Sequence, residues 1–433
     1  MSNIAYAGLG VLVLLLFLVM GMNIGTCMMA IGFFGVWIIR GFNSALTTLY
    51  NIPFTQSTNY SFAVIPLFVL MGNLAFHSGM STDLYYCFHR LFKGFRGGLA
   101  ITTVAACALF SAICGSSAAT AATMGVVALP EMRRYGYDDG LSCGSIAAGG
   151  TLGILIPPST CFIIYGIVSG ASIGELFAAG IIPGIVLALC YIASIIIVVH
   201  IWPDKAPKAK ITGEKHPEAI IGALAMAALF FLAIGGIFLG WFSAVEASAV
   251  GSTAAFVYLI ARGRFTWKNF MAAMRDTVKT SGMIFLILIG AYVFGVFLTV
   301  TGLPNFLATL VTSLNVNRWV VVIIILVIYA IMGCFMDSLA MVTLTVPIFL
   351  PIMLELGFDE IWYGVVMVMV MELGLMTPPV GMNVYIVAGV AKDVPLQKIF
   401  GGVIPMVLGM FVAIILVCCF PQLAHWLPGL LGY

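Results

Sequence analysis

Long apolar runs separated by short polar links extend from one end of the chain to the other. A helix needs ~20 predominantly apolar residues to cross the hydrocarbon of a bilayer, and most of these runs are close to that length. The pattern predicts an all-α polytopic membrane protein. Its single helical segments are expected at 4–21, 24–39, 62–78, 140–168, 175–202, 219–240, 243–261, 281–303, 360–391 and 397–420. Two further segments, 97–132 and 318–353, each predict a pair of helices.

The composition changes this picture little. Of 433 residues, 62% are hydrophobic and 8% are charged, whereas charged residues make up about a quarter of a soluble domain. The net charge of +2 gives no reason to expect a nucleic-acid partner, so the lipid bilayer is the expected surrounding. No basic residue precedes the first apolar run, which therefore predicts a retained helix and not a cleaved signal peptide. The ten cysteines contain no C-x-x-C pair and are expected to be small buried residues.

The second half of the chain repeats part of the first. At an offset of 221 residues, 116–159 aligns with 337–380 without a gap, and 11 of the 44 positions are identical. Apolar composition could align leucines, but the identities also include glycines, prolines and an aspartate. Both copies carry a proline pair, in "LGILIPPS" (152–159) and "LGLMTPPV" (373–380). The pattern therefore indicates an internal duplication.

The positive charges predict how the two copies are oriented. Arg90, Lys93 and Arg96 precede the segment 97–132, and Arg133 and Arg134 follow it. Under the positive-inside rule both ends of this segment face the cytoplasm, so it is expected to be a re-entrant hairpin. Five predicted crossings separate it from the second hairpin, an odd number that inverts the second copy. This threading places 16 of the 18 Lys and Arg residues inside, leaves Arg40 and Arg318 outside, and puts both termini outside.

The repeat also predicts four interruptions of helix at membrane depth: the two hairpin tips and the two proline pairs. Unpaired backbone groups are costly in hydrocarbon, so such backbone is expected to be buried in protein or to line a polar cavity. Any one interruption could be a simple kink or a close helix contact. Four interruptions at repeat-related positions favour a binding site near the midplane, where helix ends offer carbonyl groups to a cation and N–H groups to an anion. Good N-caps stand at Ser116, Ser117, Ser159, Asp337 and Ser338, and both proline pairs suit a first helical turn.

Three acidic residues lie within apolar segments. Asp337 suits either a helix cap or an ion ligand, and the two roles are equally open. Glu372 is expected to form a structural hydrogen bond with a neighbouring helix. Glu246, in "FSAVEASAVG", is expected to serve packing or an interface.

With these motifs, the chain resembles the large membrane subunit of the tripartite ATP-independent periplasmic (TRAP) transporters, the M type. The resemblance covers essentially the whole sequence. It is carried by "PLFVLMGNLAFHSGM" (66–80), "CGSSAATAATMG" (114–125), "GTLGILIPPS" (150–159), "GCFMDSLAMVTLTVPIFLPI" (333–352) and "LGLMTPPVGMNVY" (373–385). In one departure, the Thr-Pro-Thr-Glu common before the small-residue run is reduced to Glu246.

The resemblance implies a sodium-driven importer of the bacterial inner membrane, with both termini periplasmic. It implies a small Q-type membrane subunit and a periplasmic binding protein that delivers an organic acid. A transport domain would move past a scaffold as an elevator. The scaffold would comprise 1–80 and 219–303, and the transport domain 97–203 and 318–433. Arm helices at 81–96 and 304–317 and a cytoplasmic loop at 204–218 would connect them.

The resemblance also implies positions for ligands around the interruptions. Sodium would be held by Gly115, Ser116, Ser117, Gly333, Asp337, Gly374 and Thr377. The candidate substrate-binding residues are Ser117, Thr120, Pro158, Ser159, Ser338, Pro379 and Asn383. The identity of the organic acid does not follow from it, because related transporters take dicarboxylates, sialic acid, sugar acids or sulfonates.

Three alternatives remain open from the sequence. The nearest is a sodium–dicarboxylate symporter that needs no binding protein, which would share the hairpins and proline interruptions. An intramembrane enzyme would use Asp337 or Glu372 as an acid, although the chain has no H-E-x-x-H motif. A channel is the third. The chain has no G-x-x-x-x-G-K phosphate loop, so an ion gradient is the expected energy source.

Overall fold

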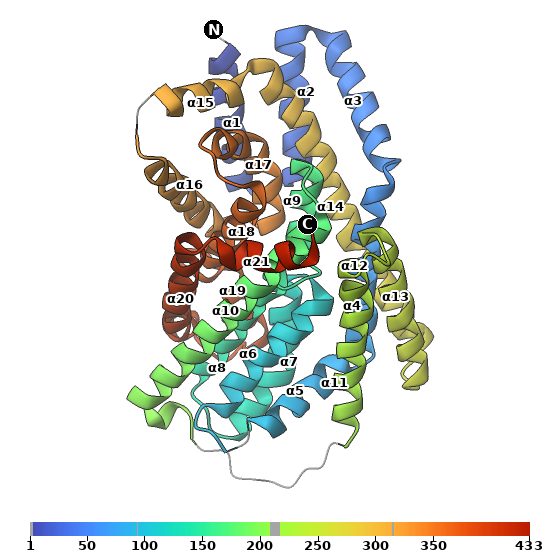
Figure 1. Ribbon diagram of the computed structural model, residues 1–433, viewed down its shortest axis with the longest axis vertical. Helices are drawn as coiled ribbons and strands as arrows, with labels where there is room; N and C mark the ends of the chain where they lie inside the picture. Colours follow the sequence, from blue (N-terminus) through green and yellow to red (C-terminus); the bar gives the residue numbers. More distant parts are fainter. Residues whose placement is uncertain (1–2, 93, 208–216, 314–315) are drawn as a thin grey trace.

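The computed structural model describes residues 3–92, 94–207, 217–313 and 316–433, and helices dominate throughout (Figure 1). No β-strand occurs in these described ranges. Eight helical segments are long and apolar enough to cross a membrane, and four shorter apolar helices accompany them. The expected class, an all-helical polytopic membrane protein, is therefore confirmed.

The first section of the chain forms four α-helices of 14–17 residues, followed by a shorter amphipathic one of 12 residues. Several large apolar side chains of this section are exposed, among them Leu12, Phe34 and Ile38. Their exposure is consistent with a surface that faces lipid. The elements are α1 (Asn3–Val19), α2 (Ile24–Arg40), α3 (Phe42–Ser57), η1 (Tyr60–Ala63), α4 (Val64–His77) and α5 (Met80–Leu91).

Two consecutive sections follow, and the first of them ends in the 29-residue helix α10 (Ile173–Ile201). It comprises α6 (Gly98–Cys114), α7 (Ser117–Arg134), α8 (Asp139–Leu155), α9 (Thr160–Ser169), α10 (Ile173–Ile201) and η2 (Pro203–Lys205). The next section comprises α11 (Pro217–Phe230), the π-helical turn η3 (Phe231–Gly235), α12 (Gly236–Phe238), α13 (Ala244–Ala261), α14 (Trp267–Thr301) and α15 (Leu303–Ser313).

The last section repeats the order of the α6–α10 section. It comprises α16 (Arg318–Gly333), α17 (Ser338–Glu355), α18 (Glu360–Met376), α19 (Met382–Val390), α20 (Leu396–Cys419) and α21 (Gln422–Leu431). The first and last residues of α17 lie 221 positions after those of α7, and the same holds for α18 and α8. The sequence offset therefore reappears in the bounds of the helices.

Three predictions about elements need correction. No helix was expected over 42–57, where α3 lies, and none over 422–431, where α21 lies. The segment expected at 281–303 is the second part of a 35-residue helix, α14, that begins at Trp267. Within the expected loop 204–218, residues 208–216 are outside the described part of the chain.

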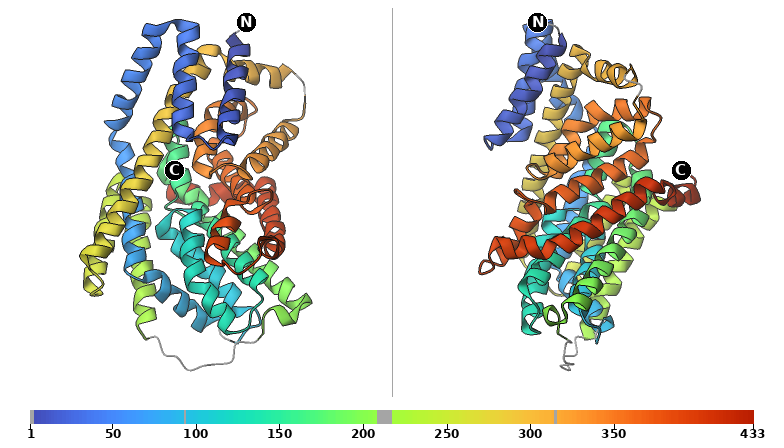
Figure 2. Two further views of the ribbon diagram at one scale, coloured as in Figure 1. Left: turned by 180° about the vertical axis from the view of Figure 1, so that it is seen from behind. Right: turned by 90° about the vertical axis from the view of Figure 1, so that its left-hand side faces the viewer.

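The helices form two groups that lie side by side. α3, α4, α11, α13 and α14 run along one side of the molecule, while α6–α10 and α16–α20 fill the other (Figure 1). Helix α14 packs along α2 and α4, and α4 packs on α13. The two amphipathic helices α5 and α15 lie at opposite ends of the long axis, as all three views show (Figures 1 and 2).

Candidate functional site

The first helical interruption separates α6 from α7 by two residues. Gly115 caps α6 with a φ of 63°, a left-handed conformation that favours glycine. Ser116 is extended and caps α7, where its hydroxyl accepts a hydrogen bond from the Ala119 amide at 3.4 Å. The predicted cap at Ser116 is confirmed, while Ser117 is the first helical residue.

The second interruption, between α8 and α9, contacts the first. The Thr160 amide and hydroxyl both donate to the carbonyl oxygen of Gly115, at 3.2 Å and 2.8 Å. Ser159 caps α9 and its hydroxyl accepts from the Phe162 amide at 3.2 Å, as predicted. Pro157 and Pro158, joined by a cis peptide bond, precede this cap. Their expected place in the first helical turn is wrong, because the link from Ile156 to Ser159 is not helical.

The third interruption, between α16 and α17, ends in a carboxylate cap. Asp337 is extended and its side chain accepts a hydrogen bond from the Leu339 amide at 3.1 Å. This confirms the cap, and an ion-binding role for Asp337 stays a prediction. Ser338, like Ser117 in the other half, is the first residue of its helix and is buried.

The fourth interruption lies between α18 and α19 and packs against the third. A Cβ added at Gly374 would lie 2.5 Å from the Cα atom of Gly333, so only glycine allows α16 and α18 to approach this closely. The Thr377 hydroxyl lies 3.2 Å from the Cys334 sulfur and 3.2 Å from the Gly374 carbonyl oxygen. Pro378 and Pro379, also joined by a cis bond, precede the start of α19 at Met382. Here too the expected placement in a first helical turn is wrong.

Buried polar side chains pair with one another between these interruptions. The Ser338 hydroxyl donates to Glu372 Oε1 at 3.0 Å, which confirms the expected structural hydrogen bond of Glu372. The Asn383 amide nitrogen donates to the Ser117 hydroxyl at 2.6 Å. Glu372 Oε2, Asn383 Oδ1 and the Thr120 hydroxyl are buried and have no hydrogen-bond partner among the described residues. The centre therefore offers oxygen atoms at a depth where unpaired polar atoms are costly.

The two repeats are interleaved around this centre. α9 of the first repeat packs on α17 of the second, and α19 of the second packs on α7 and α8 of the first. Cys161, in the first turn of α9, is buried near the carboxyl groups of Glu372 and Asp337. Both repeats thus contribute side chains to the centre, which neither repeat forms by itself.

The two proline links differ in accessibility. Pro157, Pro158 and Ser159 are buried, whereas Pro378 and Pro379 are exposed. Of the expected site residues, Pro379 therefore lies at the surface of the described chain and not among the buried polar groups. The structure adds Glu372, Thr160 and Cys334 to the candidate site. Only Glu372 had a signal in the sequence, namely a carboxylate within a long apolar run.

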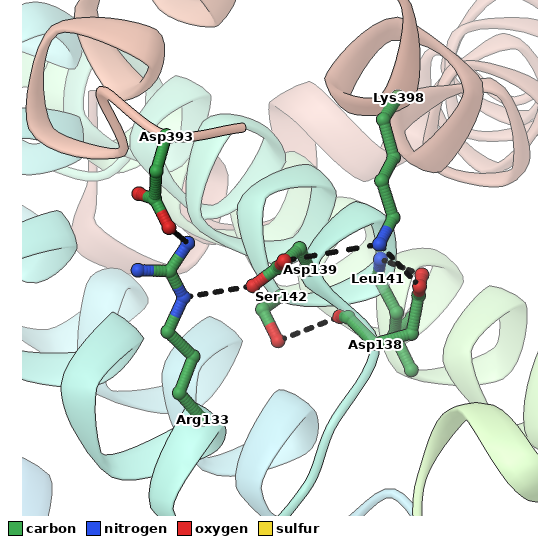
Figure 3. Close-up of polar contacts among 7 residues, drawn as sticks. All are labelled: Arg133, Asp138, Asp139, Leu141, Ser142, Asp393 and Lys398. Atoms are coloured by element: carbon green, nitrogen blue, oxygen red, sulfur yellow. Dashed lines mark hydrogen bonds and ion pairs between the residues drawn. The ribbon is translucent and has the colours of Figure 1, made fainter. Parts of the chain in front are cut away.

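An ionic network joins the same two repeats at the other end of α8 (Figure 3). Arg133, in the last turn of α7, contacts Asp139 and Asp393, each at 2.8 Å. Lys398 of α20 contacts Asp138 at 3.0 Å. The hydrogen bond from Arg133 lowers the pKa of the Asp393 carboxyl. Burial opposes ionisation of Asp138, but hydrogen bonds from Lys398 and the Leu141 amide outweigh it and lower the pKa of that carboxyl.

Fold comparison shows that the polytopic helical architecture is shared with solved membrane-protein structures. The structure superposes on the YdaH transporter of Alcanivorax borkumensis with a TM-score of 0.64 and 15% identity, over 90% of this chain and 89% of that one. It superposes on MtrF of Neisseria gonorrhoeae with a TM-score of 0.63 and 15% identity, over 89% of this chain and 85% of that one. At this identity the likeness establishes the fold alone.

Sequence comparison places the chain in one family. Residues 11–423 match the family described as the tripartite ATP-independent periplasmic transporter, DctM component, and the chain belongs to that family. It is 34% identical to the C4-dicarboxylate TRAP transporter large permease protein DctM of Pseudomonas aeruginosa, over 90% of this chain and 94% of the relative. It is 33% identical to the sialic acid TRAP transporter large permease protein SiaM of Vibrio cholerae, over 87% and 88% of the two chains.

A longer relative is the isethionate TRAP transporter permease protein DctMQ of Oleidesulfovibrio alaskensis. The identity is 30%, over 88% of this chain and 60% of the relative. Because the family and these relatives are transporter permeases, the recognition from motifs is confirmed and the intramembrane-enzyme alternative is excluded.

Proposed function

We propose that this chain is a secondary active importer subunit that moves a small organic-acid anion together with sodium. The single observation that carries the proposal is the buried polar centre of Ser117, Ser338, Glu372 and Asn383, built by both repeats between interrupted helices. The cargo classes named for the relatives, C4-dicarboxylate, sialic acid and isethionate, support an organic acid as substrate.

Sodium is proposed to bind at the helix ends around that centre. The first position uses Gly115, Ser116 and Ser117 together with Gly333 and Asp337, and the second uses Thr377 with Gly374. The contact of Thr377 with Gly374 supports the second position, because it places a hydroxyl beside a carbonyl oxygen at the end of α18. Each charge that crosses a membrane potential of 100 mV gains ~2.3 kcal/mol, so two or more sodium ions outweigh the cost of importing one anion.

The anion is proposed to bind between the two proline links. The exposed link before α19 gives access from the surface, and Asn383 in the first turn of α19 contacts Ser117. N–H groups at the starts of α9 and α19 can interact with a carboxylate. Ser159, Ser338 and Thr120 complete the proposed pocket, with Pro158 and Pro379 as its apolar borders.

The proposed movement is that of an elevator. The α6–α10 and α16–α20 sections, with α6–α7 and α16–α17 as oppositely oriented re-entrant hairpins, form the transport domain. The helices of 1–80 and 219–303 form the scaffold, with α5 and α15 as arms. The interleaving of α9 with α17 and of α19 with α7 supports movement of both repeats as one body.

We further propose that the chain acts in the bacterial inner membrane, with both termini periplasmic, beside a Q-type small subunit and a periplasmic binding protein. The length of the DctMQ relative, of which this chain matches 60%, supports a second permease portion. An alternative of similar fold is a sodium–dicarboxylate symporter that needs no binding protein.

Reconstitution into liposomes tests the proposal. Uptake of labelled dicarboxylate, sialate and isethionate is measured with the Q-type subunit and the cognate binding protein, under a sodium gradient or with choline in place of sodium. We expect saturable uptake of one organic acid that stops when choline replaces sodium. Unchanged uptake in choline would refute sodium coupling, and uptake of free substrate by the chain alone would favour the symporter.

A further inference from the structure

A crevice of about 440 Å³ lies between the two groups of helices. One wall is α14 with the last turn of α2, and the other wall is formed by α9 and α17. Its lining is Arg40, Val168, Ala291, Tyr292, Gly295, Val296, Thr299, Val300 and Pro347. The Tyr292 hydroxyl donates to the Ile167 carbonyl oxygen at 3.1 Å and so spans the two walls directly.

This crevice is distinct from the candidate transport site. Along α9, Val168 lies eight residues beyond Thr160, and along α17, Pro347 lies nine residues beyond Ser338. At 1.5 Å per helical residue, the crevice is displaced from the buried polar centre by roughly 12–14 Å on both helices.

The polar groups of the lining match one anionic group and little else. Arg40 carries its only charge, and no acceptor in the described part of the chain pairs with the Arg40 guanidinium. The Tyr292 hydroxyl is engaged with Ile167, and the Thr299 hydroxyl donates to the Gly295 carbonyl oxygen at 2.8 Å. A polyhydroxylated or dicarboxylate cargo would leave most of its polar groups unpaired here. A ligand with one anionic group and an apolar body would pair its anionic group with Arg40 and place its apolar body against the apolar lining.

Arg40 stands beside aromatic side chains of the kind that mark a membrane–water interface. The rings of Trp37 and Phe42 are 5.1 Å apart, and both side chains are exposed, by 43% and 46%. Exposed tryptophan at a helix end is typical of the headgroup level of a bilayer. Phospholipid headgroups are therefore the anionic groups that Arg40 meets at the highest local concentration.

We propose that this crevice binds one anionic phospholipid, with its phosphate at Arg40 and an acyl chain along Ala291, Val296 and Pro347. The lipid contacts α2 and α14 on one side and α9 and α17 on the other. The lipid therefore binds more tightly when the two walls are as close as they are in this structure than when they have moved apart. Its binding stabilises this relative position of the two groups of helices. The expectation that the bound lipid slows uptake rests on the proposed transport function. The expectation that the lipid binds in the crevice does not.

Two substitutions test separately the contribution of the Arg40 charge and that of the crevice volume. Arg40→Gln removes the anion partner. Gly295→Leu fills the crevice, and its side chain is accommodated because a Cβ at Gly295 meets no atom within 4 Å. The matched control is Arg318→Gln, since Arg318 is the other arginine expected outside and stacks on Phe358 at 5.1 Å, away from the crevice. Melting temperatures of the purified variants verify that each is folded.

Binding is measured on the full chain by native mass spectrometry with equal amounts of dioleoyl phosphatidylglycerol and dioleoyl phosphatidylcholine. We expect one retained phosphatidylglycerol, a preference reduced on the order of tenfold in Arg40→Gln, and loss of that lipid in Gly295→Leu. Arg318→Gln should keep the preference. Retention that does not depend on Arg40 or on Gly295 would overturn the proposal, as would Arg40-dependent binding of oleate without binding of phosphatidylglycerol.

The stabilising role is tested separately in liposomes of the two lipids. Phosphatidylglycerol should slow uptake by the unmodified chain and leave uptake by Gly295→Leu unaffected. Equal rates for the unmodified chain in both lipids would overturn this role. If no uptake is seen in either lipid, the proposed transport function fails, and the binding measurement still decides the lipid site.

Discussion

At Gly374 and Gly333 the close approach of α16 and α18 depends on the absence of side chains. We predict that Gly374→Ala destabilises the protein by about 1–3 kcal/mol and lowers uptake, because its Cβ would lie 2.5 Å from Gly333 Cα and would force the helices apart. Melting temperature and initial uptake rate measure this. Gly389→Ala is the matched control, because a Cβ there meets nothing within 4 Å in the same half of the chain. An unchanged melting temperature in Gly374→Ala would contradict the prediction.

Glu372 combines a structural contact with a buried carboxyl oxygen that has no partner in the described residues. We predict that Glu372→Gln lowers sodium-driven uptake at least tenfold with little change in stability. The amide can still accept the Ser338 hydrogen bond, but it carries no negative charge to attract a cation. Glu372→Ala, which unpairs Ser338 and leaves a cavity, should cost about 2–4 kcal/mol in addition. Full uptake by Glu372→Gln would limit Glu372 to a structural role.

At the residue scale, the sequence predicted the positions of helix caps better than it predicted which buried side chains form hydrogen bonds with each other. The caps at Ser116, Ser159 and Asp337 follow from local chemistry, because a capping side chain binds backbone two or three residues ahead. The pair of Asn383 with Ser117 joins residues 266 positions apart, and no local pattern specifies it. The proline pairs were misplaced because a proline is equally compatible with a link before a cap and with a first turn.

At the element scale, apolar length predicted most helices and failed where a helix is not uniformly apolar. Helix α3 contains polar residues at many positions together with Pro53, so its hydropathy does not stand out. The first part of α14 carries Lys268, Arg275 and Lys279, so the predicted segment began too late, at residue 281. Helices α17 and α18 begin and end 221 residues after α7 and α8. The repeat predicts this agreement, because a duplicated sequence preserves the positions of its caps.

The network that joins the α7–α8 turn to the link before α20 predicts an acid-dependent stability (Figure 3). The pKa values of Asp393 and Asp138 are lowered in the folded protein. Their contribution is therefore complete above the unfolded pKa of about 4 and is lost as the pH falls through the lower folded values. Melting temperature should be flat from about pH 6 to 8 and fall below about pH 4.

Asp393→Asn should weaken that acid dependence, because the amide has no charge to lose. Asp204→Asn is the control, since Asp204 makes no ion pair in the described part of the chain. The same acid-induced loss in Asp393→Asn as in the unmodified protein would show that the Arg133–Asp393 contact does not contribute.

At the scale of the whole molecule, aromatic side chains pack across the boundary between the two groups of helices, and a cross-link placed there can hold the two groups together. Phe68 of α4 and Phe177 of α10 lie across this boundary with their ring centroids 6.1 Å apart. Phe62 of η1 and Phe285 of α14 both lie on the side of the boundary that contains α4, with their ring centroids 6.0 Å apart. The two pairs are thus equally close, and they differ in whether they join one group or two. Sequence alone could predict the groups from the repeat, but it could not predict these contacts, which arise only when the groups are packed.

We predict that a short bismaleimide cross-link between Phe68→Cys and Phe177→Cys abolishes uptake, because in the proposed elevator the transport domain moves past the scaffold in every cycle. The same reagent on Phe62→Cys with Phe285→Cys should leave most uptake intact, because both positions belong to the proposed scaffold. The ten native cysteines are replaced first, and cross-linked and unreacted samples of each pair are compared in liposomes. Because the reagent holds the two groups together without filling the buried polar centre, full uptake by the cross-linked Phe68–Phe177 pair would rule out relative movement of the two groups at this boundary.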